Sequence, residues 1–128
     1  MLDYVMVGCT NLKRAAKFYD ALFAPLGYVR AQEDKTFVLY GPKSTPGKGY
    51  FYVTRPYNKK GMTPGNGTMI TVKAKSRKAL AAFHAAGLAA GGKDEGEPGA
   101  RPADSNEHYA YIRDLDGNKI CASCIKAK

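Results

Sequence analysis

Two cysteines near the end of the chain are the first candidates for chemistry. Cys121 and Cys124 form a Cys-x-x-Cys pair, a spacing found in zinc sites and in redox-active dithiols. Residues three apart on a strand point to opposite faces, so a shared metal would require a bulge. We therefore expect either an inert buried thiol or, for Cys121, a nucleophile that needs a neighbouring base. By strand parity, the nearest groups that could activate Cys121 are Tyr109, Tyr111 and Arg113.

Tyr109, Tyr111 and Arg113 occupy alternate positions just before a sharp turn. Alternation of this kind places the three side chains on one face of a strand. The planar guanidinium of Arg113 is suited to holding a carboxylate or a phosphate. The alternative is an ion pair between Arg113 and Asp114 or Asp116. The sequence leaves both roles open.

The first half of the chain is predicted to have the element order βαβββ. Residues 2–8 alternate apolar side chains as a strand does. A helix follows, with apolar residues at spacings of three and four from Leu12 to Phe23, Asn11 as its cap, and Gly27 beyond its end. Short β-branched or aromatic runs predict three more strands, at residues 28–32, 36–40 and 50–54.

The second half is predicted to repeat this order after a Pro-, Gly- and Asn-rich segment, residues 55–67. With one constant shift of 65 residues, Phe18 falls on Phe83, Val7 on Val72, and the cap Asn11 on Ser76, which is predicted to cap the second helix. The predicted elements are a strand at 68–74, a helix at 76–90, a weakly patterned strand near 93–97, and a hairpin of strands 108–113 and 119–125. We therefore expect one α+β domain, residues 1–128, with module 1 at about 1–57 and module 2 at about 66–128.

The composition favours a cytoplasmic protein. The chain has 128 residues and no stretch near the roughly 20 apolar residues that a membrane span requires, so no membrane association is expected. Its three cysteines are odd in number and lie in apolar segments, which favours reduced thiols over a disulfide framework.

The net charge of +9 favours anionic partners. The basic residues are scattered along the sequence, without a helix-turn-helix, a zinc finger or an Arg-rich arm, so no specific nucleic-acid partner is expected. The alternatives are a solvated basic surface, a positive field that guides a small anionic ligand to a pocket, and weak, salt-sensitive binding of nucleic acid.

Three segments of the chain resemble the vicinal oxygen chelate superfamily, which includes glyoxalase I, bleomycin-resistance proteins and extradiol dioxygenases. These segments are LDYVMVGCTNLKRAAKFYDALFAPLGY, GNGTMITVKAKSRKALAAFHAAGLAAGG and YAYIRDLDGNKICASC, and the resemblance covers nearly the whole chain. It implies two βαβββ modules whose strands form a curled mixed sheet around a cavity. It also implies a homodimer.

The resemblance identifies four positions at which the superfamily usually holds a divalent metal, in the first and last strand of each module. They correspond to Tyr4, Tyr52, Met69 and Cys121, with Phe51 as the alternative to Tyr52. None is a histidine or a carboxylate, the donors that such metals prefer. A phenol ordinarily loses its proton near pH ~10 and a thiol near ~8.5. We therefore expect no metal cofactor, and core packing is the other role open to Tyr4, Tyr52 and Met69.

The preferred function is metal-independent binding of a small organic molecule in an aromatic-lined cavity, and the charge of +9 favours an anionic ligand. The expected ligand-binding residues are Tyr4, Tyr52, Met69, Tyr109, Tyr111, Arg113 and Cys121. A charge of +9 disfavours sequestration of a cationic drug such as bleomycin. The alternative is an enzyme of the glyoxalase superfamily, a lyase similar to lactoylglutathione lyase or a dioxygenase, with non-standard metal ligands or metal-free acid–base chemistry. The sequence assigns no catalytic residue.

Overall fold

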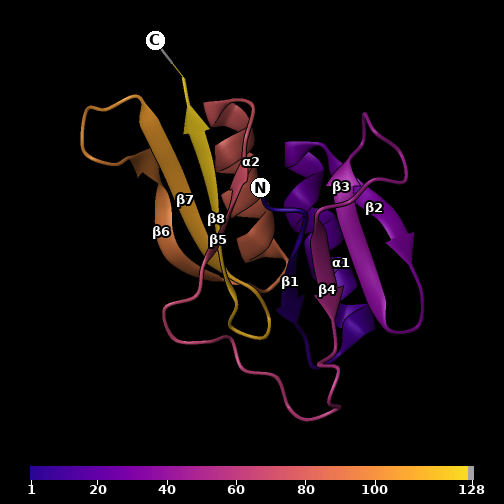
Figure 1. The fold of residues 1–128 in the computed structure, drawn as a ribbon. Helices are drawn as coiled ribbons and strands as arrows, with labels where there is room; N and C mark the ends of the chain where they lie inside the picture. The colour runs from indigo at the N-terminus through magenta and orange to yellow at the C-terminus, as the bar shows by residue number, and fades with distance from the viewer. Residues whose placement is uncertain (127–128) are drawn as a thin grey trace.

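A computed structural model describes residues 1–126 as two four-stranded mixed sheets that lie side by side, each with one helix (Figure 1). The elements of the first half are β1 Val5–Gly8, α1 Leu12–Phe23, the short 3₁₀ helix η1 Ala24–Leu26, β2 Tyr28–Glu33, β3 Phe37–Pro42 and β4 Phe51–Thr54. Those of the second half are β5 Ile70–Lys73, α2 Arg77–Ala89, β6 Lys93–Ala100, β7 Glu107–Arg113 and β8 Lys119–Ile125. The predicted order βαβββ is confirmed in both halves.

The two sheets have the same topology. The N-terminal sheet has the strand order β1-β4-β3-β2, and the C-terminal sheet has the order β5-β8-β7-β6. In each sheet the first strand of the module pairs in parallel with the last, and the other pairs are antiparallel. The fold is therefore α+β, with two sheets that are curled but not closed. None of the helices among residues 1–126 combines the length and apolar character needed to cross a bilayer.

The helices begin where the sequence predicts. The Asn11 side chain accepts a hydrogen bond from the N–H of Arg14 at 3.0 Å, and Ser76 caps α2 in the same way through Ala79 at 3.0 Å. Gly27 follows η1 with φ = 79°, a left-handed conformation that favours glycine. The repeated cap positions therefore reflect repeated local structure.

The strand over residues 93–97, the weakest in the sequence pattern, extends to Ala100 in the structure. Its pairing with β7 contains two irregularities, between Asp94 and Gly96 and between Gly96 and Gly99. A side chain at Gly96 would collide with the Tyr111 ring, at 2.6 Å. The strand thus lacks an apolar alternation because it is an edge strand that lies close against an aromatic ring.

Each sheet packs one face on the helices and leaves the other face open. In the N-terminal sheet Val7, Tyr40 and Val53 point to the helices and are buried. In the C-terminal sheet Ile112 and Ala122 do the same. One continuous apolar cluster joins the two halves through the helices. The side chains between these positions along each strand form what we call the open faces.

A buried carboxylate connects the two halves. Asp114 Oδ2 accepts hydrogen bonds from the Tyr19 hydroxyl at 2.5 Å and from the Asn118 amide nitrogen at 2.8 Å. Asp114 Oδ1 accepts from the backbone N–H groups of Asp116 and Asn118. The Asn118 amide also donates to the carbonyl of Gly8 at 2.8 Å, which fixes the turn of the second module against the first strand of the chain. Burial and the neighbouring Asp114 raise the pKa of Tyr19, so its phenol remains a donor.

Replacing Asp114 with alanine is expected to lower the free energy of unfolding by about 3 kcal/mol, because it leaves the buried Tyr19 and Asn118 donors without an acceptor. Urea unfolding followed by circular dichroism measures the change. The exposed carboxylate of Asp3 is the control, and Asp3→Ala should change stability by less than about 0.5 kcal/mol. Equal stability of the Asp114→Ala and parent proteins would show that this connection contributes little.

Candidate functional site: the open faces of the two sheets

The open face of the N-terminal sheet carries a cluster of three aromatic rings. The Tyr4 and Tyr52 ring centres are 4.9 Å apart in an edge-to-face arrangement, and Phe37 lies 5.4 Å from Tyr52. Tyr4 keeps 51% of its surface exposed, and Met6 beside it keeps 54%. Tyr4 therefore does not belong to the core, which was the other role open to it.

The open face of the C-terminal sheet carries a second aromatic pair, flanked by cations. The rings of Tyr109 and Tyr111 are stacked with centres 6.3 Å apart. The Arg101 guanidinium lies 5.8 Å from the centre of the Tyr111 ring, and the Lys119 ammonium lies 5.4 Å from it. Both distances are within the range of cation–π contacts. Strand parity with Cys121 could have identified Lys119, but no sequence signal points to Arg101.

Arg113 lies on the face predicted for it and is already paired. Its Nε donates to Glu95 at 2.5 Å, and its Nη1 donates to the Gly117 carbonyl at 2.8 Å. The alternative ion pair with Asp114 or Asp116 does not form, because backbone and amide donors engage Asp114 and the partner of Arg113 comes from β6. Arg113 therefore has its charge paired with a carboxylate, whereas Arg101 donates to the backbone carbonyls of Glu97 at 2.9 Å and of Ala100 at 3.4 Å.

Cys121 lies on the open face next to Tyr111, but neighbouring side chains cover it completely. Its register partners are Tyr111 on β7 and Thr71 on β5. Burial raises the pKa of the Cys121 thiol, although hydrogen bonds from Thr71 and Tyr111 act in the opposite direction. A thiol that is covered and protonated is a poor nucleophile.

The other thiols are also buried and inert. Cys124 lies on the helix-facing side of β8, opposite to Cys121, so the Cys-x-x-Cys pair does not converge on one metal. Burial and the charge of Asp116 raise the pKa of Cys9 to about 11. All three cysteines are free.

The histidines lie away from the open-face tyrosines. His84, on α2, is buried and its Nε2 lies 2.9 Å from Asp94 Oδ1. His108 is half-buried on β7, at a position that alternates with Tyr109. Neither histidine therefore faces the same side as Tyr109 and Tyr111.

The donors on the open faces do not fit a divalent metal. Among residues 1–126, no group of three or more His, Cys, Asp or Glu side chains is arranged to hold an ion. Tyr4 and Tyr52 contact each other on one sheet, whereas Met69 directly precedes β5 and Cys121 lies on β8 of the other sheet. The structure thus divides the seven predicted site residues into two groups, one on each open face.

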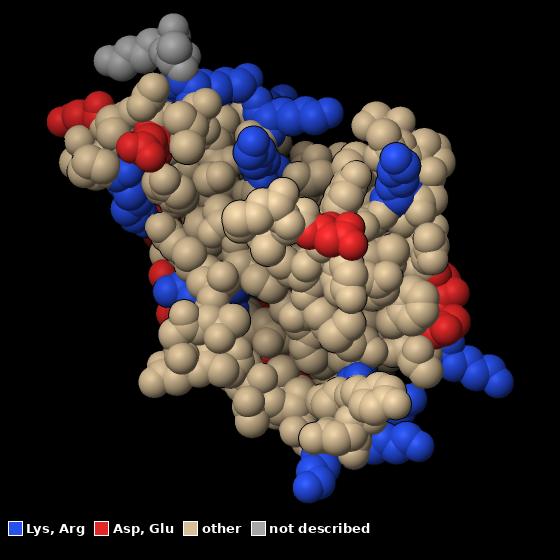
Figure 2. All heavy atoms as spheres, in the orientation of Figure 1, with Lys and Arg blue, Asp and Glu red and all other residues tan. Residues whose placement is uncertain are grey.

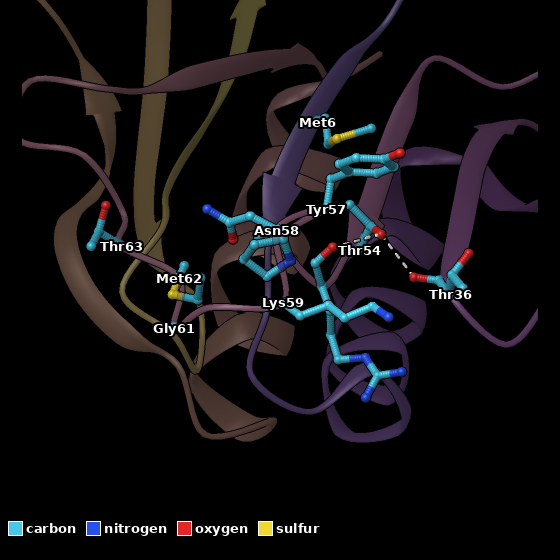
Figure 3. Close-up of a pocket in the computed structure, with 12 residues that line it drawn as sticks. Met6, Thr36, Thr54, Tyr57, Asn58, Lys59, Gly61, Met62 and Thr63 are labelled. Atoms are coloured by element: carbon cyan, nitrogen blue, oxygen red, sulfur yellow. Dashed lines mark hydrogen bonds between the residues drawn. The ribbon is translucent and has the colours of Figure 1, made fainter.

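A hollow with a volume of about 890 Å³ lies beside the N-terminal open face. It is formed by Met6, Gly8, Thr36, Thr54 and the connecting segment from Arg55 to Thr63 (Figure 3). The Thr54 hydroxyl donates to the Thr36 carbonyl at 2.7 Å, and the Tyr57 ring lies next to Met6 (Figure 3). None of the seven predicted site residues lines this hollow. The sequence pattern predicts only a connecting segment for residues 55–67.

The architecture agrees with that of glyoxalase-related structures. A glyoxalase/bleomycin resistance protein from Albidiferax ferrireducens T118 is 41% identical, with a TM-score of 0.83 over 96% of this chain and 97% of that one. A glyoxalase-related enzyme from Fulvimarina pelagi has 17% identity and a TM-score of 0.71 over 96% and 86%. A V278E mutant of glyoxalase I from Zea mays has 25% identity and a TM-score of 0.71 over 94% and 44%.

The chain belongs to the glyoxalase/bleomycin resistance protein family, as its identity with the Albidiferax protein over nearly the full length of both chains shows. The fold and the family predicted from the sequence are therefore confirmed. No protein-family model matches the sequence, and no curated protein matches it.

The buried cysteines lead to a prediction about reactivity. We expect iodoacetamide at neutral pH to leave Cys9, Cys121 and Cys124 unmodified in the folded protein, because burial excludes the reagent and raises the pKa of Cys9 and Cys121. Peptide mass spectrometry measures the modification, with the guanidinium-unfolded protein as the fully reactive control. Rapid stoichiometric labelling of native Cys121 would instead identify it as an accessible nucleophile.

Proposed function

We propose that this protein binds a small aromatic anion on its open faces without a metal ion. The observation that carries the proposal is the placement of Arg101 and Lys119 within 6 Å of the Tyr111 ring, itself stacked on Tyr109. Tyrosine rings provide flat surfaces for an organic ring, and the two cations provide the charge that attracts an anionic group. Family membership supports binding of an organic molecule in this region.

The protonation of the two tyrosines favours an anion. The hydrogen bond to Glu107 and the charge of that carboxylate raise the pKa of Tyr109, while burial and the neighbouring Cys121 raise that of Tyr111. Both phenols therefore stay neutral at physiological pH and do not repel a negative ligand. Nearby carboxylates are engaged, Glu95 by Arg113 and Glu107 by the Tyr109 hydroxyl.

Metal independence follows from donor chemistry. A methionine thioether at position 69 is a poor ligand for hard divalent ions, and the raised pKa of Cys121 disfavours its thiolate. Side-chain cations must then stabilise the ligand charge. The three free thiols also support a cytoplasmic location.

Anilinonaphthalene sulfonate, a fluorescent aromatic anion, is expected to bind the purified protein equally well with and without EDTA. Lys119→Gln should weaken this binding roughly two- to fivefold, because it removes one exposed charge beside Tyr111. Phenylnaphthylamine, which has the same rings without the sulfonate, should bind more weakly and be insensitive to Lys119→Gln. Fluorescence titration measures the affinities.

Lys13→Gln on the exposed side of α1 is the matched control. It removes the same charge, but from a different element than the strands that carry Tyr109, Tyr111 and Lys119. Equal effects of Lys13→Gln and Lys119→Gln would contradict specific binding at Tyr111.

The titration is repeated after addition of Ni, Mn, Fe(II) or Zn, with metal content and melting temperature recorded. One tightly bound ion per chain together with a raised melting temperature would overturn metal independence and support the alternative, a lyase or dioxygenase with non-standard ligands.

We further propose that the binding site is completed in a homodimer. Tyr4, Met6 and Met69 expose between 43% and 54% of their surfaces on or beside the open faces. Clustered apolar exposure of this kind marks an interaction surface. The present chain covers 44% of the maize glyoxalase I chain, so that protein has the length of two such units. A second copy of this chain would supply the same surface by symmetry.

Sedimentation velocity is expected to show a dimer that Tyr4→Lys combined with Met69→Lys converts to monomer, because buried like charges would oppose association. Leu88→Lys, at a similarly exposed apolar position on α2, should remain a dimer. A parent protein that stays monomeric at every concentration tested, or a Leu88→Lys protein that dissociates as readily, would contradict the proposal.

A further inference from the structure

A second hollow brings together lysines that are far apart in the sequence. Its volume is about 830 Å³. Its walls come from both halves of the chain, from η1 and the ends of β2 and β3 on one side and from the ends of β5 and β8 on the other. Its lysines are Lys43, Lys73, Lys75 and Lys126.

Backbone hydrogen bonds hold the lysine-bearing segments in place. The Lys43 N–H donates to the Gly27 carbonyl at 2.9 Å, and the Tyr28 hydroxyl donates to the Lys73 carbonyl at 3.0 Å.

The charge that the described residues contribute to this hollow is positive. No Asp or Glu lines it, and among residues 1–126 no salt bridge involves any of its four lysines. All four side chains are exposed. Figure 2 shows blue side chains along the upper part of the visible face, near the C-terminal end of the described chain. Like charges held around one concavity raise the local concentration of anions.

The floor and rim of the hollow are apolar. Leu26 is buried beneath it, Tyr28 and Pro42 are half-buried, and Ile125 is exposed at its edge. A ligand that fits therefore combines several negative charges with a less polar part. This hollow is separate from the site proposed on the open faces, because that site lies around Tyr111 on β7.

We propose that this hollow binds a small organic polyanion, of the class of diphosphate esters, across the two halves of the chain. Lys43 comes from the first half, and Lys73, Lys75 and Lys126 come from the second. Two adjacent phosphate groups carry more negative charge than one, so they can attract lysines from both halves. Orthophosphate is shorter and has less charge, so it should bind more weakly. This proposal does not depend on the function proposed for the open faces.

The test uses the full-length protein with pyrophosphate, ADP, orthophosphate and adenosine as probes, and isothermal titration calorimetry as the measurement. Pyrophosphate and ADP are expected to bind and to raise the melting temperature, orthophosphate to bind more weakly, and adenosine not to bind. Lys43→Gln combined with Lys75→Gln should weaken ADP binding roughly tenfold, because two exposed charges are removed. Both lysines are exposed, so the double variant should fold normally.

Lys13→Gln combined with Lys17→Gln is the matched control, with the same charge change on the exposed side of α1. An equal loss of ADP affinity in this control would show that net charge alone attracts the probe, and would overturn the site. Failure of pyrophosphate and ADP to bind the parent protein would do the same. A single-stranded oligonucleotide that binds more tightly than ADP, and loses affinity equally in both double variants, would assign the lysines to a diffuse nucleic-acid surface instead.

Discussion

The buried carboxylate of Asp114 is the interaction on which the arrangement of the two halves depends. It accepts hydrogen bonds from Tyr19 of α1 and from Asn118, whose amide also holds the carbonyl of Gly8 at the end of β1. A buried carboxylate is tolerated only where donors satisfy it, so these groups must stay together. The network therefore fixes the turn between β7 and β8 relative to the first strand and helix.

This arrangement determines which surfaces remain for binding. Because both helices contribute to one apolar cluster, each sheet has one face committed to the core and one face open. The open faces carry the exposed Tyr4 and Met6 on one sheet and the cation-flanked Tyr111 on the other. The same contact between halves also brings Lys43, Lys73 and Lys75 to the lining of one hollow. Both proposed ligand sites thus follow from how the modules meet.

The sequence predicted the local structure well and the side-chain partners poorly. Alternation and capping residues are local signals, so the order βαβββ and the caps Asn11 and Ser76 could be predicted. Strand parity likewise placed Tyr109 and Tyr111 on one face. The pairing of Arg113 with Glu95 could not be predicted, because it depends on an edge strand whose register is interrupted twice. The cation at Arg101 and the lysine-lined hollow depend on contacts between distant segments, which leave no periodic pattern.

The substituted metal positions and the positive charge of the chain have a common explanation. A divalent ion held by histidine and carboxylate ligands places positive charge next to a bound oxygen. The carboxylate ligands in turn neutralise part of the charge of the ion. Tyr4, Tyr52, Met69 and Cys121 at those positions offer neither histidine nor carboxylate donors for such an ion. In the function that we propose, an anion is instead recognised by lysine and arginine, whose charge is carried on flexible side chains and screened by salt. Arg101 and Lys119 would supply that charge beside Tyr111, where the flat aromatic surface would restrict how the ligand is oriented.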